Sequence, residues 1–126
     1  MEEIKSNLEE NGYVETLFNR RIYINDSNAK NQRLRGFAER QAINAPIQGS
    51  AADIIKLAMV KIHKNLFNYK NDVSMLMQVH DELVFEIEDS DIHRYGDKIS
   101  DLMGSAEKLS VPLLVNTFSG SNWQET

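Results

Sequence analysis

Apolar side chains recur with two different periods along the chain, and each period predicts one kind of element. Short runs rich in β-branched and aromatic residues, which are typical of strands, predict two hairpins, 13–17 with 21–24 and 73–79 with 83–87. Apolar residues three or four positions apart predict helices over 2–11, 34–43, 46–66 and 92–109. A final strand is predicted over 111–115, with Pro112 at a sheet edge. This order of elements predicts an α+β domain with helices on one face of an antiparallel sheet.

Turn-forming residues mark the boundaries between these elements. Asn11-Gly12 is a helix stop, and polar loops are expected over 25–32 and 68–72. No capping residue precedes the first helix, so we expect the chain to start inside a helix. Pro46 disfavours the helical region for Ala45, so a break or kink is expected there between two helices.

Composition narrows the class of protein. The chain has 126 residues, enough for one domain with a real core, and 41% of them are hydrophobic. It contains no cysteine, which excludes disulfides and thiolate zinc sites. No apolar run approaches the ~18 residues of a membrane helix, and the acidic start resembles no signal peptide. We therefore expect a soluble intracellular protein with no membrane partner.

The net charge of −5 conceals a basic segment. Residues 19–40 carry a net charge of +4 and residues 41–79 one of +2, whereas residues 1–18 carry −4 and residues 80–126 carry −7. Such a basic segment is consistent with a surface that faces phosphates, and equally with a solvated charged loop.

The predicted second hairpin holds the strongest candidate chemistry. Gln78, His80, Asp81 and Glu82 lie where its chain must reverse. Carboxylate oxygens at the tip of a rigid hairpin suit Mg²⁺, although acidic residues in turns are also common for local backbone reasons. Two adjacent carboxylates on a tight turn rarely both reach one ion, so one ligand and one bystander are expected. Two ions bridging a phosphoryl group need a further carboxylate from elsewhere.

Other chemistries find less support in the sequence. His80-Asp81 is also the pair found in metal-dependent phosphohydrolases, but His63 and His93 are not spaced as further ligands. No nucleophile-elbow, GxGxxG or Walker-type glycine pattern is present.

Arg40, Asn44 and Gln48 recur every four residues, so on a continuous helix they would share one face. Their donors would suit the minor-groove acceptors that every base pair presents, and they would equally suit a polar helix face in water. The small residues 49–52 allow either tight packing against a sheet or the approach of a bulky ligand such as a duplex.

Taken together, these strings resemble the C-terminal part of the bacterial family A DNA polymerases. The resemblance rests on residues 12–17 (GYVETL), 19–23 (NRRIY), 38–56 (AERQAINAPIQGSAADIIK) and 78–86 (QVHDELVFE). It extends to VPL at 111–113 and GSNW at 120–123, so it covers nearly the whole chain. It implies half of a polymerase palm domain, with the predicted second hairpin as the catalytic hairpin.

The resemblance also implies a role for each matching residue. Asp81 would be a catalytic aspartate that holds Mg²⁺ for attack of the primer 3′-hydroxyl on a nucleotide, and Glu82 its less critical neighbour. The residues expected to touch primer–template DNA are Arg40, Asn44, Gln48, Gln78 and His80. Arg20 and Arg21 are expected as phosphate contacts on weaker grounds.

Several parts of such a polymerase are not in the sequence. The Asp-Tyr-Ser-type motif with the other catalytic aspartate is absent, as are the fingers helix, the thumb and an exonuclease domain. We therefore expect residues 1–126 to be a palm fragment that is inactive alone, from a cytoplasmic polymerase that works on DNA and dNTP at the nucleoid. The alternative is a non-catalytic module that binds duplex ends or a protein. Exposed former interfaces would also favour self-association.

Overall fold

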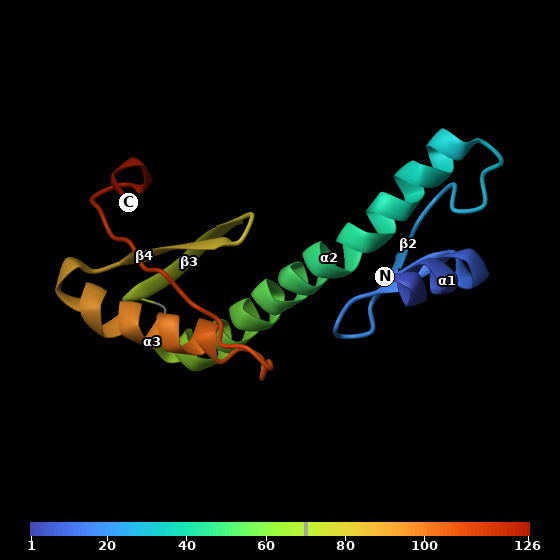
Figure 1. Cartoon of the computed structure of the whole chain (residues 1–126). Helices are drawn as coiled ribbons and strands as arrows, with labels where there is room; N and C mark the ends of the chain where they lie inside the picture. Colours follow the sequence, from blue (N-terminus) through green and yellow to red (C-terminus); the bar gives the residue numbers. More distant parts are fainter. Residues whose placement is uncertain (70) are drawn as a thin grey trace. The chain divides into compact units, whose positions relative to one another are not determined.

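The computed structural model describes residues 1–69 and 71–126, so Lys70, in the predicted loop 68–72, lies outside the described residues. The chain forms two units, Met1–Asp53 and Ile54–Thr126, each of which has its own core (Figure 1). The long helix α2 (Gln32–Leu66) contributes residues to both.

The first unit contains α1 (Glu2–Asn11), β1 (Tyr13–Glu15), β2 (Arg21–Tyr23) and the first part of α2. α1 ends at Gly12, which adopts a left-handed conformation (φ 74°) and donates its N–H to the carbonyl oxygen of Leu8. This confirms the predicted stop, because glycine enters that conformation without a Cβ clash. β1 and β2 pair antiparallel, which confirms the predicted hairpin, but the strands end at Glu15 and Tyr23 rather than at 17 and 24; Tyr13 lies opposite Tyr23.

The core of the first unit joins α1, the β1–β2 hairpin and α2. Its buried residues are Leu8, Val14, Ile24, Ala38 and Ala42. The two alanines are completely buried, so the backbone of α2 lies close to its neighbours. That packing fixes which face of α2 remains in solvent.

Of the break or kink expected at Pro46, the break is wrong, because residues 44–46 are helical and α2 is assigned as one helix through the proline; a kink there stays a prediction. Pro46 has no N–H to donate to the carbonyl one turn earlier, so the helix forgoes one hydrogen bond there. Packing of Ala38, Ala42 and Ala45 in the core holds the helix before the proline, and hydrogen bonds to Gly49, Ser50 and Asp53 hold it after the proline. Local preference is thus overridden by tertiary contacts.

The second unit contains the rest of α2, the hairpin of β3 (Val73–Val79) and β4 (Glu82–Ile87), and α3 (Ile92–Gly104). Three short 3-10 turns complete the assigned elements: η1 (Phe67–Tyr69), η2 (Asp89–Asp91) and η3 (Trp123–Glu125). The core of this unit gathers Ile62, Leu66, Val73, Tyr95 and Ile99 from α2, β3 and α3. Leu83, Phe85 and Ile87 of β4 pack against this core, so one face of the hairpin is covered (Figure 1).

The predicted final strand over 111–115 is wrong, since this segment pairs with no strand of the described chain. It nevertheless keeps the alternation of a strand: Leu113 and Val115 are half-buried while Leu114 is 89% exposed. The segment runs past the end of α3: a Cβ on Gly104 would lie 3.7 Å from the carbonyl oxygen of Leu113, which is ordinary van der Waals contact. The apolar alternation therefore reflects packing on a helix rather than sheet pairing.

The α+β class is confirmed, although its strands form two separate two-stranded antiparallel sheets rather than one. α3 ends at Gly104, five positions before the predicted 109. Among the described helices, none combines the length and apolar character needed to cross a membrane.

Candidate active site

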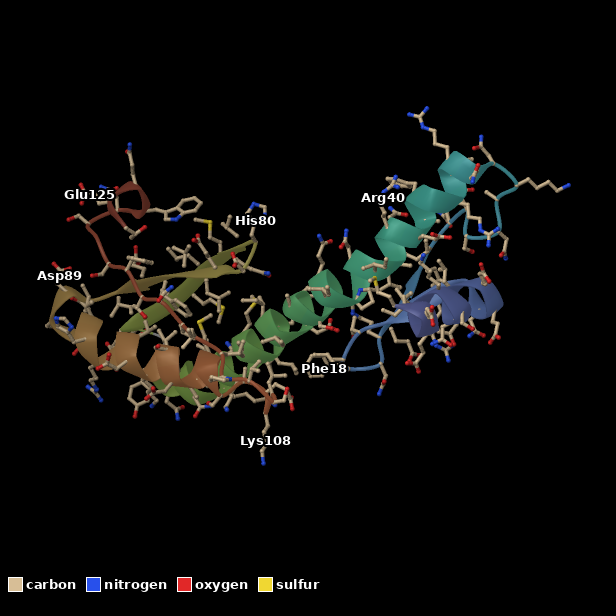
Figure 2. All side chains as sticks on the ribbon, in the orientation of Figure 1. Phe18, Arg40, His80, Asp89, Lys108 and Glu125 are labelled. Carbon is tan, nitrogen blue, oxygen red and sulfur yellow. The ribbon has the colours of Figure 1, made fainter. Side chains whose placement is uncertain are left out.

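The β3–β4 hairpin turns through only two residues, His80 and Asp81, because Val79 is paired with Glu82. His80 is left-handed (φ 54°), a conformation that costs a non-glycine residue about 1–2 kcal/mol. The side-chain Nε2 of Gln78 donates to the carbonyl oxygen of His80 (3.0 Å) and so braces the turn from within. Figure 2 shows His80 at the tip of the hairpin, clear of the strands.

A bulge in β3 sets which residues share a face near this turn. Met75 pairs with Phe85 and Met77 with Val84, so Leu76 is an extra residue in β3. Beyond the bulge, Gln78 lies opposite Leu83, which packs against the core of the unit. Glu82 precedes Leu83 on β4 and so faces the other side of the hairpin. The turn thus separates the two acids: Asp81 lies at the tip and Glu82 on the outer face.

Asp81 is exposed and forms no hydrogen bond or ion pair within the described part of the chain. A hard anionic oxygen that has no internal partner fits Mg²⁺, which binds through one or two carboxylates and retains several waters. In the ranges 1–69 and 71–126, no three His, Cys, Asp or Glu side chains come close enough together to hold a metal. The turn can therefore supply only part of a metal site.

Arg40, Asn44 and Gln48 are all exposed and lie at four-residue intervals on α2. The helix continues through Pro46, so the three side chains form one row on its solvent side. Figure 2 shows Arg40 projecting from α2 on the side away from α1. The row is in the first unit, whereas the turn with Gln78, His80 and Asp81 is in the second. Each group is brought together within its own unit.

The connection between β1 and β2 packs on α2 at the end of this row. Arg20 Nε donates to Oδ1 of Asp53 (2.8 Å), and Arg20 Nη2 donates to the carbonyl oxygen of Gly49 (3.3 Å). The hydroxyl of Ser50 accepts the N–H of Leu17 (2.9 Å) and donates to the carbonyl oxygen of Pro46. Gly49 and Ser50 thus serve close packing against this connection, whereas Ala51 is exposed.

The sequence interpretation missed Asp53 and Ser50 as partners of the β1–β2 connection. The run of small residues beginning at Gly49 was the available signal, but it does not name the segment that packs there.

Arg21 does not contact α2 in the way that Arg20 does. Its Cζ lies 4.6 Å from the centre of the Tyr13 ring, and its Nε lies 3.6 Å from Oε1 of Glu15. The pKa of Arg21 is raised, mainly by a hydrogen bond with Tyr23 and next by the nearby Tyr13, so its guanidinium stays positively charged.

Comparison with known proteins defines the class to which this arrangement belongs. The sequence model of DNA polymerase family A matches residues 1–125, and the chain belongs to that family.

Individual relatives are DNA polymerase I proteins of bacteria. The chain is 46% identical over 125 residues to the enzymes of Streptococcus pneumoniae and Pseudomonas aeruginosa, matching 99% of this chain and 14% of theirs. It is 48% identical over 119 residues to that of Caldicellulosiruptor bescii, matching 93% of this chain and 14% of the relative. A solved structure of the POL domain of Pol1 from M. smegmatis, in complex with DNA primer-template and dNTP, superposes with a TM-score of 0.82 at 38% identity. That match covers 90% of this chain and 20% of the other.

Proposed function

We propose that residues 1–126 are the C-terminal part of a polymerase palm domain that takes part in template-directed DNA synthesis. The observation that carries this proposal is the two-residue turn that presents Asp81 to solvent, in a chain that belongs to DNA polymerase family A. The chain spans 14% of the length of the DNA polymerase I relatives named above, so the complete reaction requires parts that this sequence does not contain.

Asp81 is the proposed metal-binding catalytic residue, and Glu82 its supporting neighbour. Bound Mg²⁺ would supply positive charge to stabilise the charge that develops on the nucleotide phosphate as the primer 3′-hydroxyl attacks. The short turn fixes the backbone of Asp81 between two paired strands, which limits how far its carboxylate can move. Glu82, on the outer face of β4, adds negative charge beside the site.

Arg40, Asn44 and Gln48 are proposed to contact the primer–template duplex along its minor groove, with Gln78 and His80 contacting it from the hairpin. A guanidinium and two amides can donate to the acceptors that every correct base pair presents there. Recognition of this kind tests the geometry of a pair without reading its sequence. Primer–template DNA and dNTP are the inferred partners, as in the solved M. smegmatis complex.

We infer that the chain alone is inactive, because only one of the two metal-binding carboxylates of the family motifs is in this sequence. A primer-extension assay with labelled primer–template, dNTP and Mg²⁺ tests this inference, and no extension is expected. Extension that disappears in Asp81→Asn would contradict the inferred inactivity while supporting the role of Asp81.

The duplex face is tested separately by a salt titration of primer–template binding, followed by fluorescence anisotropy. Arg40→Ala should weaken binding to all sequences alike, since its proposed contact does not read bases. Lys30→Ala is the matched control, because Lys30 is exposed in the loop before α2 and carries the same charge. Equal effects of the two substitutions would mean that only net charge matters, and the proposed face would be wrong.

A non-catalytic module for duplex ends is the second candidate. It is favoured by one specific observation: the row of Arg40, Asn44 and Gln48 lies on a single helix, whereas no group of three metal-ligating side chains forms among residues 1–69 and 71–126. Duplex binding that persists in Asp81→Asn and without Mg²⁺, with no extension under any condition, would select it for the chain on its own.

Self-association through the C-terminal segment is also proposed. Leu114, Phe118 and Val111 are 89%, 73% and 66% exposed, which is costly for a surface left in water. Light scattering over a range of concentrations should show dimers or larger species, and a strictly monomeric profile would count against self-association.

We place the parent polymerase in the cytoplasm at the nucleoid, where its DNA substrate is found.

A further inference from the structure

Arg20 is bound to two points on α2 that lie on either side of one helical turn. Its Nε donates to Asp53 (2.8 Å) and its Nη2 to the carbonyl oxygen of Gly49 (3.3 Å). The side chain of Asp53 is only 12% exposed and that of Arg20 is 47% exposed. The ion pair is therefore partly shielded from water, which makes it stronger than a fully exposed pair.

The loop that carries Arg20 is itself held in one conformation. Thr16 Oγ1 accepts the N–H groups of Phe18 (3.2 Å) and Arg20 (3.3 Å), and Thr16 is 5% exposed. The N–H of Thr16 in turn donates to the carbonyl oxygen of Arg20 (3.0 Å). Asn19 takes the left-handed conformation (φ 60°) that this tight closure needs. Arg20 thus extends from a braced loop and can hold α2 in place.

Gln48 lies directly before the segment of α2 that this loop contacts. The loop bonds to Gly49, Ser50 and Asp53, and the hydroxyl of Ser50 in turn donates to the carbonyl oxygen of Pro46 within α2, so this set of hydrogen bonds extends to both sides of Gln48. Gly49 and Ser50 are buried beneath the loop while Gln48 is exposed. The hydrogen bond that Pro46 cannot donate is missing in the preceding turn of the helix. The loop therefore holds the turn of α2 that begins immediately after Gln48.

We propose that Arg20 is a positioning residue for Gln48: it acts through Asp53 and Gly49 to fix the helical turn that holds Gln48 against the duplex. The inference rests on the proposed function, in which Gln48 contacts DNA. It differs from a direct phosphate contact by Arg20, because the ion pair with Asp53 already occupies Nε of the guanidinium.

The two roles predict opposite results for Asp53→Asn in a duplex-binding titration with the complete chain. If Arg20 positions Gln48, Asp53→Asn and Arg20→Ala both weaken duplex binding several-fold. Arg20→Lys keeps the positive charge but loses the forked contact, so it binds the duplex as weakly as Arg20→Ala does. If Arg20 contacts a phosphate, Asp53→Asn frees the guanidinium and maintains or tightens binding. Lys30→Ala is the matched control, because Lys30 is exposed, carries the same charge and belongs to no proposed DNA contact.

Two further measurements use the same variants. A positioning residue leaves the dependence of binding on salt unchanged, whereas loss of a phosphate contact lowers the log–log slope by about 0.9. The double substitution Arg20→Ala with Gln48→Ala should bind no more weakly than Gln48→Ala alone, because each single substitution removes the same contact between Gln48 and the duplex. Additive losses or a reduced slope would overturn the proposal.

Hydrogen exchange separates failure of this inference from failure of the proposed function. Arg20→Ala should speed exchange at the N–H of Leu17 and within residues 46–53. Arg21→Ala should not, because Arg21 pairs with Glu15 rather than with α2. If exchange responds in this way but Gln48→Ala leaves duplex binding intact, the duplex contact of Gln48 is wrong and Arg20 supports only the fold. If exchange does not respond, the positioning role itself is overturned.

Discussion

Gly49 lies so close to the β1–β2 hairpin that a Cβ added to it would be 2.7 Å from Cδ1 of Ile22. The same atom would be 2.8 Å from Cγ2 of Thr16, and 3.2 Å from Nη2 of Arg20. Thr16 is buried and β-branched, so it has little freedom to withdraw. Glycine at this position lets the helix and the hairpin meet, and the loop that bonds to α2 depends on that approach.

Gly49→Ala should therefore destabilise the protein by about 1 kcal/mol, since crowding outweighs the helix propensity that alanine gains. Gly36→Ala is the control on the same helix, where the nearest atom to a new Cβ is Nη1 of Arg40 at 3.8 Å. That change should stabilise by up to about 1 kcal/mol. Urea unfolding measures both, and stabilisation by both substitutions would show that the hairpin does not restrict position 49.

His80 carries a conformational cost that glycine would not. His80→Gly should raise the free energy of unfolding by about 1 kcal/mol because the residue is left-handed. The same variant should bind primer–template more weakly, since the proposed imidazole contact is lost. His80→Ala is the control, because it removes the imidazole but keeps the Cβ and hence the strain. A less stable His80→Gly would mean that the turn does not require this conformation.

The sequence predicts the β3–β4 hairpin well because local chemistry determines it. The strand bounds 73–79 agree with β3, and the polar turn at His80-Asp81 was the candidate site from the start. The bulge at Leu76 was not predicted, although the apolar run Met75-Leu76-Met77 breaks strict alternation there. A defect in alternation permits a bulge without requiring one.

Features that depend on distant partners could not be predicted in the same way. Proline at 46 indicated a break or kink, but with Ala38 and Ala42 packed in the core α2 continues through it as one helix. The run 111–115 has the alternation of a strand, yet no described strand lies beside it. Arg20 and Asp53 are 33 positions apart, so nothing in the local pattern joins them. The candidate residues themselves came from the family resemblance more than from spacing.

Tyr95 is a buried phenol in the core of the second unit, 2% exposed, and its hydroxyl donates to Oδ2 of Asp72 (3.3 Å). Burial raises the pKa of Tyr95 above its ordinary value near 10. The unfolded chain therefore releases this proton at a lower pH than the folded chain does. Stability from Tyr95 is complete below about pH 10 and declines as the pH rises further.

Tyr95→Phe should cost about 1 kcal/mol near neutral pH, through loss of the hydrogen bond, and should remove this alkaline decline. Unfolding midpoints measured from pH 7 to pH 11 should converge for the two proteins. Tyr23→Phe is the control, because Tyr23 is 69% exposed and should keep the decline of the unmodified chain. Parallel curves for Tyr95→Phe and the unmodified chain would contradict the assignment.

Mg²⁺ at the hairpin should depend on Asp81 far more than on Glu82, because only Asp81 lies at the tip of the turn. Mn²⁺ reports this directly, since it takes the same oxygen ligands and broadens the amide signals of nearby residues. Broadening should centre on His80-Asp81, vanish in Asp81→Asn and persist, weakened, in Glu82→Gln. Glu86→Gln is the control on the same face of β4, and it should have no effect at the turn.

Glu86 also lines an acidic groove with Asp72, Glu88 and Asp89. Broadening centred on that groove would show that carboxylate density, not the turn, attracts the ion, and the proposed role of Asp81 would fail.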